Sequence, residues 1–402
     1  MTQIFLLAMI LSLLVMSACG TTVSRRTVEG WVPVDETERE IPENQLLNVS
    51  IEVFDPGALP EDEKDANGLS MDIRNAEARY MPEQLRRTME NTGYWGAVRV
   101  VPGGATGGEL LVSGTILESN GNQLDLVIDA RDASGRQWFS KEYRDGVEAE
   151  FYQRNWNNYS VDAFQPLYNT IANDLVKILK TLTSDEITAI RRVAELQFAA
   201  DIAPDAFADY LQQDEKGKYN IVHLPSTDDP MYGRVQAIRE RDLLMIDTLN
   251  GHFDNFYREM QQPYTEWRKA RSDEFEKQRE LEKAALNRTL LGVAAIVGAV
   301  FVETAGGGYS PGRDVLGDVL VLGGAAAIKS GMDKRSEASI HRDTIEELGF
   351  SFSSEAQPLV LEVEGKTIEL TGSAEAQYEQ WRTLIGQIYS AETGFSESPE
   401  QY

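Results

Sequence analysis

Apolar and polar positions alternate along the first third of the chain in a way that predicts a folded domain over residues 46–182. Residues 46–54 place Leu47, Val49, Ile51 and Val53 on one side, as in a half-buried strand. Residues 75–92 have apolar positions at helical spacing, and Gly93 follows where a left-handed cap would end a helix.

Four further strands are predicted in this domain, at residues 96–102, 109–118, 123–131 and 136–143. Asn120-Gly121 is a strong signal for a hairpin between the middle two. A last helix is predicted because the apolar positions between Phe164 and Leu182 share one face. The predicted order is β-α-β-β-β-β-α. It indicates an α+β fold with a small mixed, mainly antiparallel sheet and two helices on one face.

A helical stalk is predicted over residues 183–288. Thr183 to Glu186 has the pattern of a capping box, and Pro204 favours the start of a second helix, after which residues 213–230 are expected to form a loop. A coiled-coil-type seam at spacings of three and four is then formed by Ile246, Leu249, Phe253, Phe256 and Met260. Pro263 is expected to kink or restart this helix.

Residues 289–330 hold two apolar, glycine-containing runs that predict a helical hairpin. The run at 290–302 would make only about 20 Å of helix, less than the roughly 30 Å hydrocarbon core of a bilayer. Small residues would let the two helices approach closely; they are Gly292, Gly298, Gly317, Gly323 and Gly324.

Three interpretations of this hairpin remain open. It could pack against the protein's own domains, pair with the same hairpin of other subunits in a homo-oligomer, or insert partly into a membrane. A phosphate-binding loop is excluded at Gly323–Ser330, because Ile328 stands where the tight turn needs glycine. Beyond the hairpin, residues 331–402 predict a helix and then a β-β-α unit, with Ser373 capping the final helix.

The N-terminal residues 1–18 have the pattern of a signal peptide. Their uncharged apolar run is too short for a stable span and ends in Met16-Ser17-Ala18-Cys19. This sequence resembles a bacterial lipobox, with Met16 where Leu is usual. The resemblance implies cleavage between Ala18 and Cys19 and acylation of Cys19, for example with palmitate. An ordinary secretory signal followed by a chance cysteine is the alternative.

A lipobox also implies a location. The residue after Cys19 is Gly20, and in the sorting rule of enteric bacteria it is Asp at this position that retains a lipoprotein in the inner membrane. The expected location is therefore the outer membrane, on its periplasmic face. Residues 19–45 are polar and carry Pro33 and Pro42, so they are expected to form a tether between the lipid and the first domain.

Charge and residue types narrow the classes of function. With 65 acidic and 38 basic residues the formal charge is −27, which disfavours nucleic acid as a partner. The three histidines, at positions 223, 252 and 341, are far apart and form no zinc motif. No nucleophile motif occurs, and the numerous acidic residues fit a solvated surface. The sequence therefore predicts a non-enzymatic protein with no catalytic residue, metal or cofactor.

The element order resembles the small α/β periplasmic domains of the TolB amino-terminal and curli-secretion lipoprotein families. It also resembles outer-membrane lipoproteins that activate cell-wall synthases. Residues 76–102, AEARYMPEQLRRTMENTGYWGAVRVVP, carry this likeness as a helix leading into a strand. The resemblance implies a scaffold or accessory subunit of a cell-envelope assembly, with the membrane and other envelope proteins as partners. The alternative is a self-assembling secretion or translocation component of the curli-secretion type.

Overall fold

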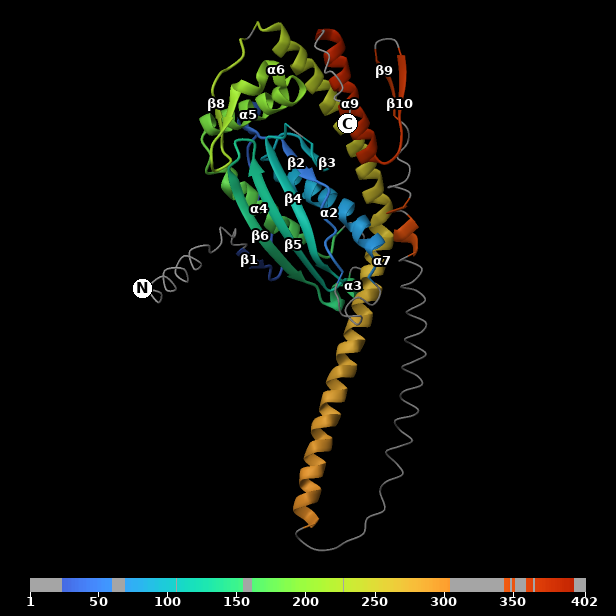
Figure 1. Ribbon diagram of the computed structural model, residues 1–402. Coiled ribbons are helices and arrows are strands. Elements are labelled where there is room, and N and C mark those ends of the chain that lie inside the picture. Colours follow the sequence, from blue (N-terminus) through green and yellow to red (C-terminus); the bar gives the residue numbers. More distant parts are fainter. Residues whose placement is uncertain are drawn as a thin grey trace, which may run out of the picture.

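The computed structural model confirms an α+β fold with a mixed sheet (Figure 1). It describes residues 24–59, 69–105, 107–154, 161–226, 228–303, 343–347, 349–350, 359–363 and 366–393. Between residues 278 and 303 the description covers the backbone only.

One six-stranded sheet organises the first domain, in the order β1-β6-β5-β4-β2-β3. Strands β4, β5 and β6 pair antiparallel, whereas β2 is parallel to both of its neighbours and β1 is parallel to β6. The strands are β1 (Ser24–Thr27), β2 (Val49–Glu52), β3 (Val98–Val101), β4 (Leu110–Ser119), β5 (Gln123–Asp132) and β6 (Gln137–Gly146). The predicted succession of elements along residues 46–182 and the hairpin at Gly121, where φ is 93°, are confirmed.

Two helices cover one face of this sheet, as predicted. They are α2 (Met71–Thr92) and α4 (Gln165–Leu179), with the short α3 (Ala149–Arg154) between β6 and α4. Helix α2 begins four residues earlier than expected, because the Ser70 hydroxyl accepts the Ile73 N–H at 3.2 Å and caps it there. Gly93 ends the helix in the left-handed conformation, as the sequence predicts.

The expected tether over residues 19–45 is wrong in part. Ser24–Thr27 forms β1 at the edge of the sheet, and Glu43–Gln45 is a short 3-10 helix, η1. The Val28 N–H donates to the Arg144 carbonyl at 2.8 Å, and the Asp35 N–H donates to Asn173 Oδ1 at 2.7 Å. This segment is polar and exposed, so it has no apolar alternation. Backbone pairing with β6 holds it, and a hydropathy pattern does not register such pairing.

Helix α5 (Ser184–Ile202) starts with the predicted capping box, and α6 (Pro204–Phe207) starts at the predicted proline. The 3-10 helix η2 (Ala208–Tyr210) follows. The loop expected at 213–230 is wrong in part, because β7 (Leu211–Gln213) and β8 (Tyr219–Ile221) form an antiparallel hairpin. This hairpin contacts the main sheet through the Tyr219 N–H, which donates to the Ser134 carbonyl at 2.8 Å.

Helix α7 runs without interruption from Pro230 to Glu303, over 74 residues, or about 110 Å at the usual rise. The restart expected at Pro263 is wrong. Proline removes one backbone hydrogen bond, but Met260, Tyr264 and Trp267 around it are buried and hold the helix against the sheet domain. Figure 1 shows the upper half of α7 beside the sheet and its last part extending away from the domain.

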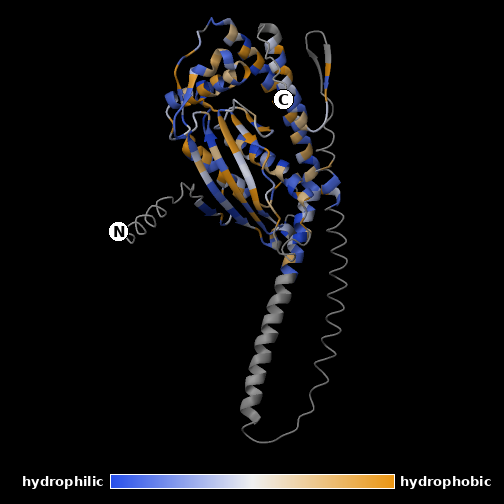
Figure 2. Cartoon of the chain, in the orientation of Figure 1, coloured by the Kyte–Doolittle hydropathy of each residue, from blue (hydrophilic) through white to orange (hydrophobic). Residues whose placement is uncertain are grey.

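The predicted seam on α7 is buried, but it packs within the chain. Ile246, Leu249 and Phe253 belong to a core shared with α5 and the C-terminal helix, whereas Phe256 and Met260 join the core under the sheet. The stalk expected over 183–288 is therefore docked on the domain along much of its length. Figure 2 shows apolar positions recurring along the strands and along the helices around them.

The predicted β-β-α unit near the C-terminus is confirmed. Strands β9 (Leu359–Val363) and β10 (Lys366–Leu370) pair antiparallel, and α9 (Ala374–Thr393) begins after Ser373, whose hydroxyl accepts the Ala376 N–H at 3.2 Å. Helix α9 packs on α7 and α5 (Figure 1). A further helical piece is described at residues 343–347.

Candidate functional site

Most site residues predicted from the sequence lie outside the described residues. These are Ala18, Cys19, Gly317, Gly323 and Gly324. Gly292 and Gly298 lie in the helical backbone of α7, so the first arm of the expected hairpin is a helix. The pairing of the two arms, and the choice between its three interpretations, falls on residues that are not described.

The structure instead brings together a buried junction between α7 and the sheet domain. At its upper end, α7 closes the free edge of β3. The Val100 N–H donates to Asn250 Oδ1 at 2.8 Å, and Asn250 Nδ2 donates to the Val100 carbonyl at 3.0 Å. Beside this pair, Arg99 on β3 makes two hydrogen bonds to Asp247, at 2.6 and 3.1 Å. The side chains of α7 therefore replace a neighbouring strand along this edge.

At its lower end, α7 meets α2 and the tip of the β4–β5 hairpin through a buried carboxylate. Glu77, 0% exposed, accepts the Tyr264 hydroxyl and the Ser119 hydroxyl, both at 2.6 Å. Arg74, one turn earlier on α2, lies 3.8 Å from Glu77 and offsets its charge. Burial raises the pKa of Tyr264, and the neighbouring Glu77 raises it further, so this hydroxyl stays protonated and donates.

A buried ion pair lies one turn further along α7. Arg268, 1% exposed, donates to Asp162 Oδ2 at 2.9 Å, and its guanidinium stacks 3.9 Å from the Tyr264 ring. Burial alone would lower the pKa of Arg268, but Asp162 raises it and keeps the guanidinium charged. Asp162 also accepts the Phe164 N–H at 2.8 Å, just before α4 begins. One carboxylate thus ties α7 to the start of α4. We call Glu77, Ser119, Asp162, Tyr264 and Arg268 the junction cluster.

The turn of the β4–β5 hairpin lies directly against this part of α7. A Cβ placed on Gly121 would lie 2.6 Å from the Arg268 carbonyl oxygen. Glycine therefore allows both the left-handed turn and the approach of α7. Tyr152 on α3 donates its hydroxyl to the Gly121 carbonyl at 2.5 Å, so the hairpin tip is held from two sides.

A second buried carboxylate connects α7 to the C-terminal helix. Asp242, 2% exposed, accepts Trp381 Nε1 at 3.1 Å and the Tyr378 hydroxyl at 3.4 Å. Burial raises the pKa of Asp242, whereas the nearby Arg382 lowers it. Helix α9 is thereby fixed on α7 by directional bonds as well as by apolar packing.

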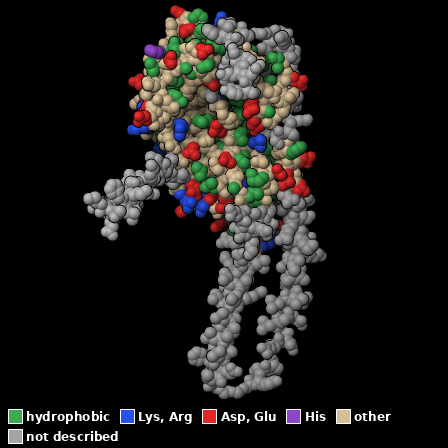
Figure 3. Space-filling view, viewed as in Figure 1, with side chains coloured by type: hydrophobic (Ala, Val, Ile, Leu, Met, Phe, Trp, Pro, Cys, Tyr) green, Lys and Arg blue, Asp and Glu red, His purple; other side chains and the backbone are tan. Residues whose placement is uncertain are grey.

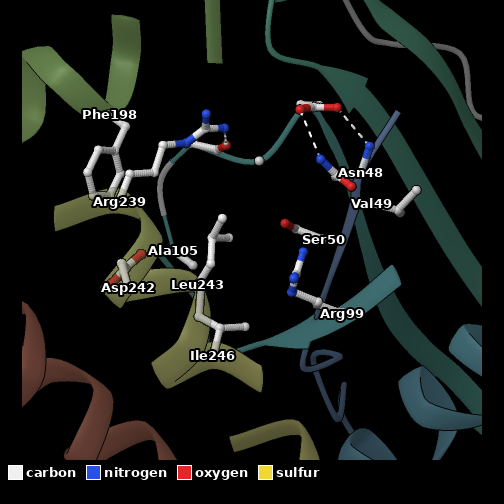
Figure 4. Close-up of a pocket in the computed structure, with 13 residues that line it drawn as sticks. Asn48, Val49, Ser50, Arg99, Ala105, Phe198, Arg239, Asp242, Leu243 and Ile246 are labelled. Atoms are coloured by element: carbon white, nitrogen blue, oxygen red, sulfur yellow. Dashed lines mark hydrogen bonds between the residues drawn. The ribbon is translucent and has the colours of Figure 1, made fainter. Parts of the chain in front are cut away.

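A cleft lies where β2, the β3–β4 loop, α5 and α7 meet (Figure 4). Its empty space, including the part open to solvent, is about 490 Å³. Figure 4 shows Asn48, Ser50 and Arg99 on the sheet side, facing side chains from α5 and α7. The latter include Phe198, Arg239, Asp242 and Ile246.

The charged groups of this cleft are already bonded to protein atoms. Glu109 accepts the Asn48 N–H at 2.7 Å and Asn48 Nδ2 at 3.0 Å, while Arg239 donates to the Gly107 carbonyl at 3.4 Å. Arg99 is held by Asp247, and Asp242 is held by α9. These bonds hold backbone and helices in place around the cleft.

Within the described ranges, no group of three or more His, Cys, Asp or Glu residues is arranged to hold a metal ion. His252 on α7 is half-buried, and burial lowers its pKa. The ring centroids of His223 and Tyr210 lie 6.0 Å apart.

Acidic and basic side chains are interspersed over the face seen in Figure 3. Among the residues that the structure describes, no helix is long and apolar enough to cross a membrane.

Comparison of the chain with protein families, curated proteins and solved structures finds no match.

The sequence contained a signal for the junction cluster that hydropathy does not register. Past Met260, spacings of four lead on along α7 to Tyr264 and Arg268. Pro263 suggested a kink or a restart of the helix, and a buried arginine is rare enough that Arg268 fits a solvated face better. The bonds of Arg268 become visible only when the distant Asp162 is brought beside it.

Proposed function

We propose that this chain is a non-enzymatic, lipid-anchored scaffold of the bacterial cell envelope. The single observation that carries the proposal is the form of α7. Its first part is fixed to the sheet domain by Asn250 and the junction cluster, and its last part extends beyond the domain (Figure 1). A long helix fixed at one end can hold a partner at a defined distance from the domain.

The length of the extending part of α7 sets the distance at which a partner could be held. Ser272 is the last buried residue among those of α7 whose exposure is described, and from it to Glu303 the helix covers about 45 Å at 1.5 Å per residue. An arm of this length reaches well past the domain. The apolar run with Gly292 and Gly298 lies near its end, where close helix packing is favoured.

The N-terminal sequence supports the anchor. Met16-Ser17-Ala18-Cys19 resembles a lipobox, and the first described strand, β1, begins five residues after Cys19. Acylation there would bring the sheet domain to a membrane surface. Gly20 favours the periplasmic face of the outer membrane, as set out above.

The scaffold role is favoured over catalysis by the chemistry of the cleft. Its carboxylates and guanidinium groups are bonded to backbone and side-chain partners, and they join β2, β3, α7 and α9. Such bonds hold elements in register. They leave no acid–base pair directed at a substrate among the described residues of the cleft.

Lipid labelling in growing cells tests the anchor. Cells expressing the chain are fed an alkyne fatty acid, and the purified protein is examined for label and mass. We expect label on the native chain and none on Cys19→Ala, which should stay exported with an uncleaved signal peptide. Export of an unlabelled native chain cleaved at another position would overturn the proposal.

A further inference from the structure

Trp31 exposes 67% of its surface on a loop that is held at both ends. On one side, the Val28 N–H donates to the Arg144 carbonyl at 2.8 Å. On the other, the Val32 carbonyl accepts Asn169 Nδ2 at 2.7 Å. Fixed backbone therefore presents a large amphipathic ring to solvent. An indole exposed in this way is typical of a contact surface or a membrane interface.

The position of Cys19 indicates which of these it is. Ser24 is five residues after Cys19, and fully extended backbone spans at most about 3.6 Å per residue, or roughly 18 Å here. The headgroup layer of one leaflet takes up about 5–8 Å of this reach. An acyl chain on Cys19 therefore holds β1 within about 10–13 Å of the lipid surface. Trp31 follows β1 directly on the same edge of the sheet.

Charge opposes contact with lipid less at this edge than over the chain as a whole. The chain carries a formal charge of −27, so most of its surface is repelled by anionic phospholipids. β1 is less acidic than the chain as a whole, because its four residues hold Arg25 and Arg26 and no acid, although the exposed Glu29 lies between β1 and Trp31. Their side chains are 59% and 46% exposed although each bonds a carboxylate, Arg25 to Glu142 and Arg26 to Asp174.

We propose that β1 and Trp31 form a membrane-docking surface. The edge of the sheet next to the lipid anchor lies on the bilayer, with the Trp31 indole in the headgroup region and Arg25 and Arg26 beside the phosphates. This inference rests on the proposed acylation of Cys19. It fixes the orientation of the domain, because the lipid then lies at the β1 edge of the sheet and α7 at the opposite, β3 edge.

The test places one nitroxide label next to Trp31 on the lipidated full chain in phosphatidylethanolamine–phosphatidylglycerol liposomes. Cys19 is the only cysteine, and the proposed lipid group blocks its sulfur, so an introduced cysteine is the sole attachment point. The label is attached through Glu29→Cys, with Trp31 intact or replaced by Ser. Leu244→Cys is the matched control, because Leu244 is 66% exposed and lies on α7, at the opposite edge of the sheet.

We expect oxygen, which partitions into lipid, to relax the label at position 29 more than a water-soluble nickel chelate does. Replacing Trp31 by Ser should make the label at position 29 more accessible to the chelate and less accessible to oxygen. The label at position 244 should relax as it does in water. A label at 29 that stays in water on liposomes that carry the protein overturns the docking surface and leaves the anchor intact. The same result with slowed label motion in native membranes would mean that a protein covers Trp31, which also overturns it. A chain that fails to float with liposomes overturns the anchor itself.

Discussion

The side chain of Asn250 bonds both free backbone groups of Val100. One carboxamide accepts the strand N–H at 2.8 Å and donates to the strand carbonyl at 3.0 Å, as a neighbouring strand would. β3 is the last strand of the sheet on this side, so these groups would otherwise be exposed for pairing with another chain. These two bonds fix both the rotation of α7 about its axis and its position along β3.

Asn250→Ala should destabilise the protein by about 1–3 kcal/mol, because it leaves two backbone groups of the buried residue Val100 unpaired. Asn250→Asp keeps the acceptor for the Val100 N–H but places a carboxylate oxygen where the amide donor lay 3.0 Å from the Val100 carbonyl, so it should cost at least as much. Hydrogen exchange of the Val100 amide should quicken in the alanine variant, as measured by NMR or mass spectrometry. Thr248→Ala is the control, because the Thr248 hydroxyl bonds only the Leu244 carbonyl of its own helix. Equal effects of Asn250→Ala and Thr248→Ala would contradict this role.

Gly121→Ala should lower the free energy of unfolding by more than the strain of a left-handed alanine alone. Gly104→Ala is the matched comparison, since Gly104 has φ of 82° and open space around it, whereas Gly121 has φ of 93° and lies against the Arg268 carbonyl. We expect about 1–2 kcal/mol for Gly104→Ala and clearly more for Gly121→Ala. Urea unfolding of both variants measures the difference, and equal costs would show that α7 does not press on this turn.

Arg268 and Asp162 should behave as a coupled pair. Arg268→Met keeps much of the packing and leaves Asp162 buried without its cation, which should cost about 3–5 kcal/mol. Asp162→Asn keeps an acceptor for the Phe164 N–H. The double variant should therefore lose less than the sum of the two single variants. A double-mutant cycle of unfolding free energies measures this coupling, and additive losses would mean that the ion pair does not hold α7.

Asp145, at the end of β6, should make stability depend on pH. Burial raises its pKa from the ordinary 3.8 to about 7, and Asp162 raises it as well, whereas the Gly146 N–H lowers it. The folded chain therefore holds a proton at Asp145 that the unfolded chain releases between these two values. Its contribution to the free energy of unfolding falls as pH rises from about 4 to 7 and stays low above 7.

Asp145→Asn should remove this dependence. We expect the variant to match the native chain near pH 4 and to exceed it at pH 8, by on the order of 1–3 kcal/mol. The comparison is made by urea unfolding at both pH values, and taking the difference between variants cancels the other titrating groups. A gain that is the same at both pH values would contradict a raised pKa at Asp145.

Elements whose sequence signals are local could be predicted from the sequence alone. The alternation at 46–54, the Asn120-Gly121 turn and the capping box at Thr183 all depend on neighbouring residues, and all are confirmed. β1 could not be predicted in this way. Its residues are exposed at every position, and only the backbone of the distant strand β6 makes them a strand.

The site was harder to predict than the fold. Asn250, Asp162 and Arg268 are polar, and their partners lie more than 100 residues away in the sequence. A polar residue on a helix predicts solvent unless its partner is known. The restart predicted at Pro263 was also wrong, because buried side chains on either side of the proline outweigh its local cost to the helix.

The central claim is that a lipid-anchored domain holds another envelope protein on the extending part of α7. Site-specific photo-crosslinking in living cells tests it most directly, with the crosslinker at Arg288 on this part of the helix and, as control, at the exposed Leu244. We predict a covalent adduct with a different envelope protein from position 288, absent from position 244 and lost in Cys19→Ala. Adducts from position 288 that contain only further copies of this chain would contradict the scaffold and favour a self-assembling secretion component.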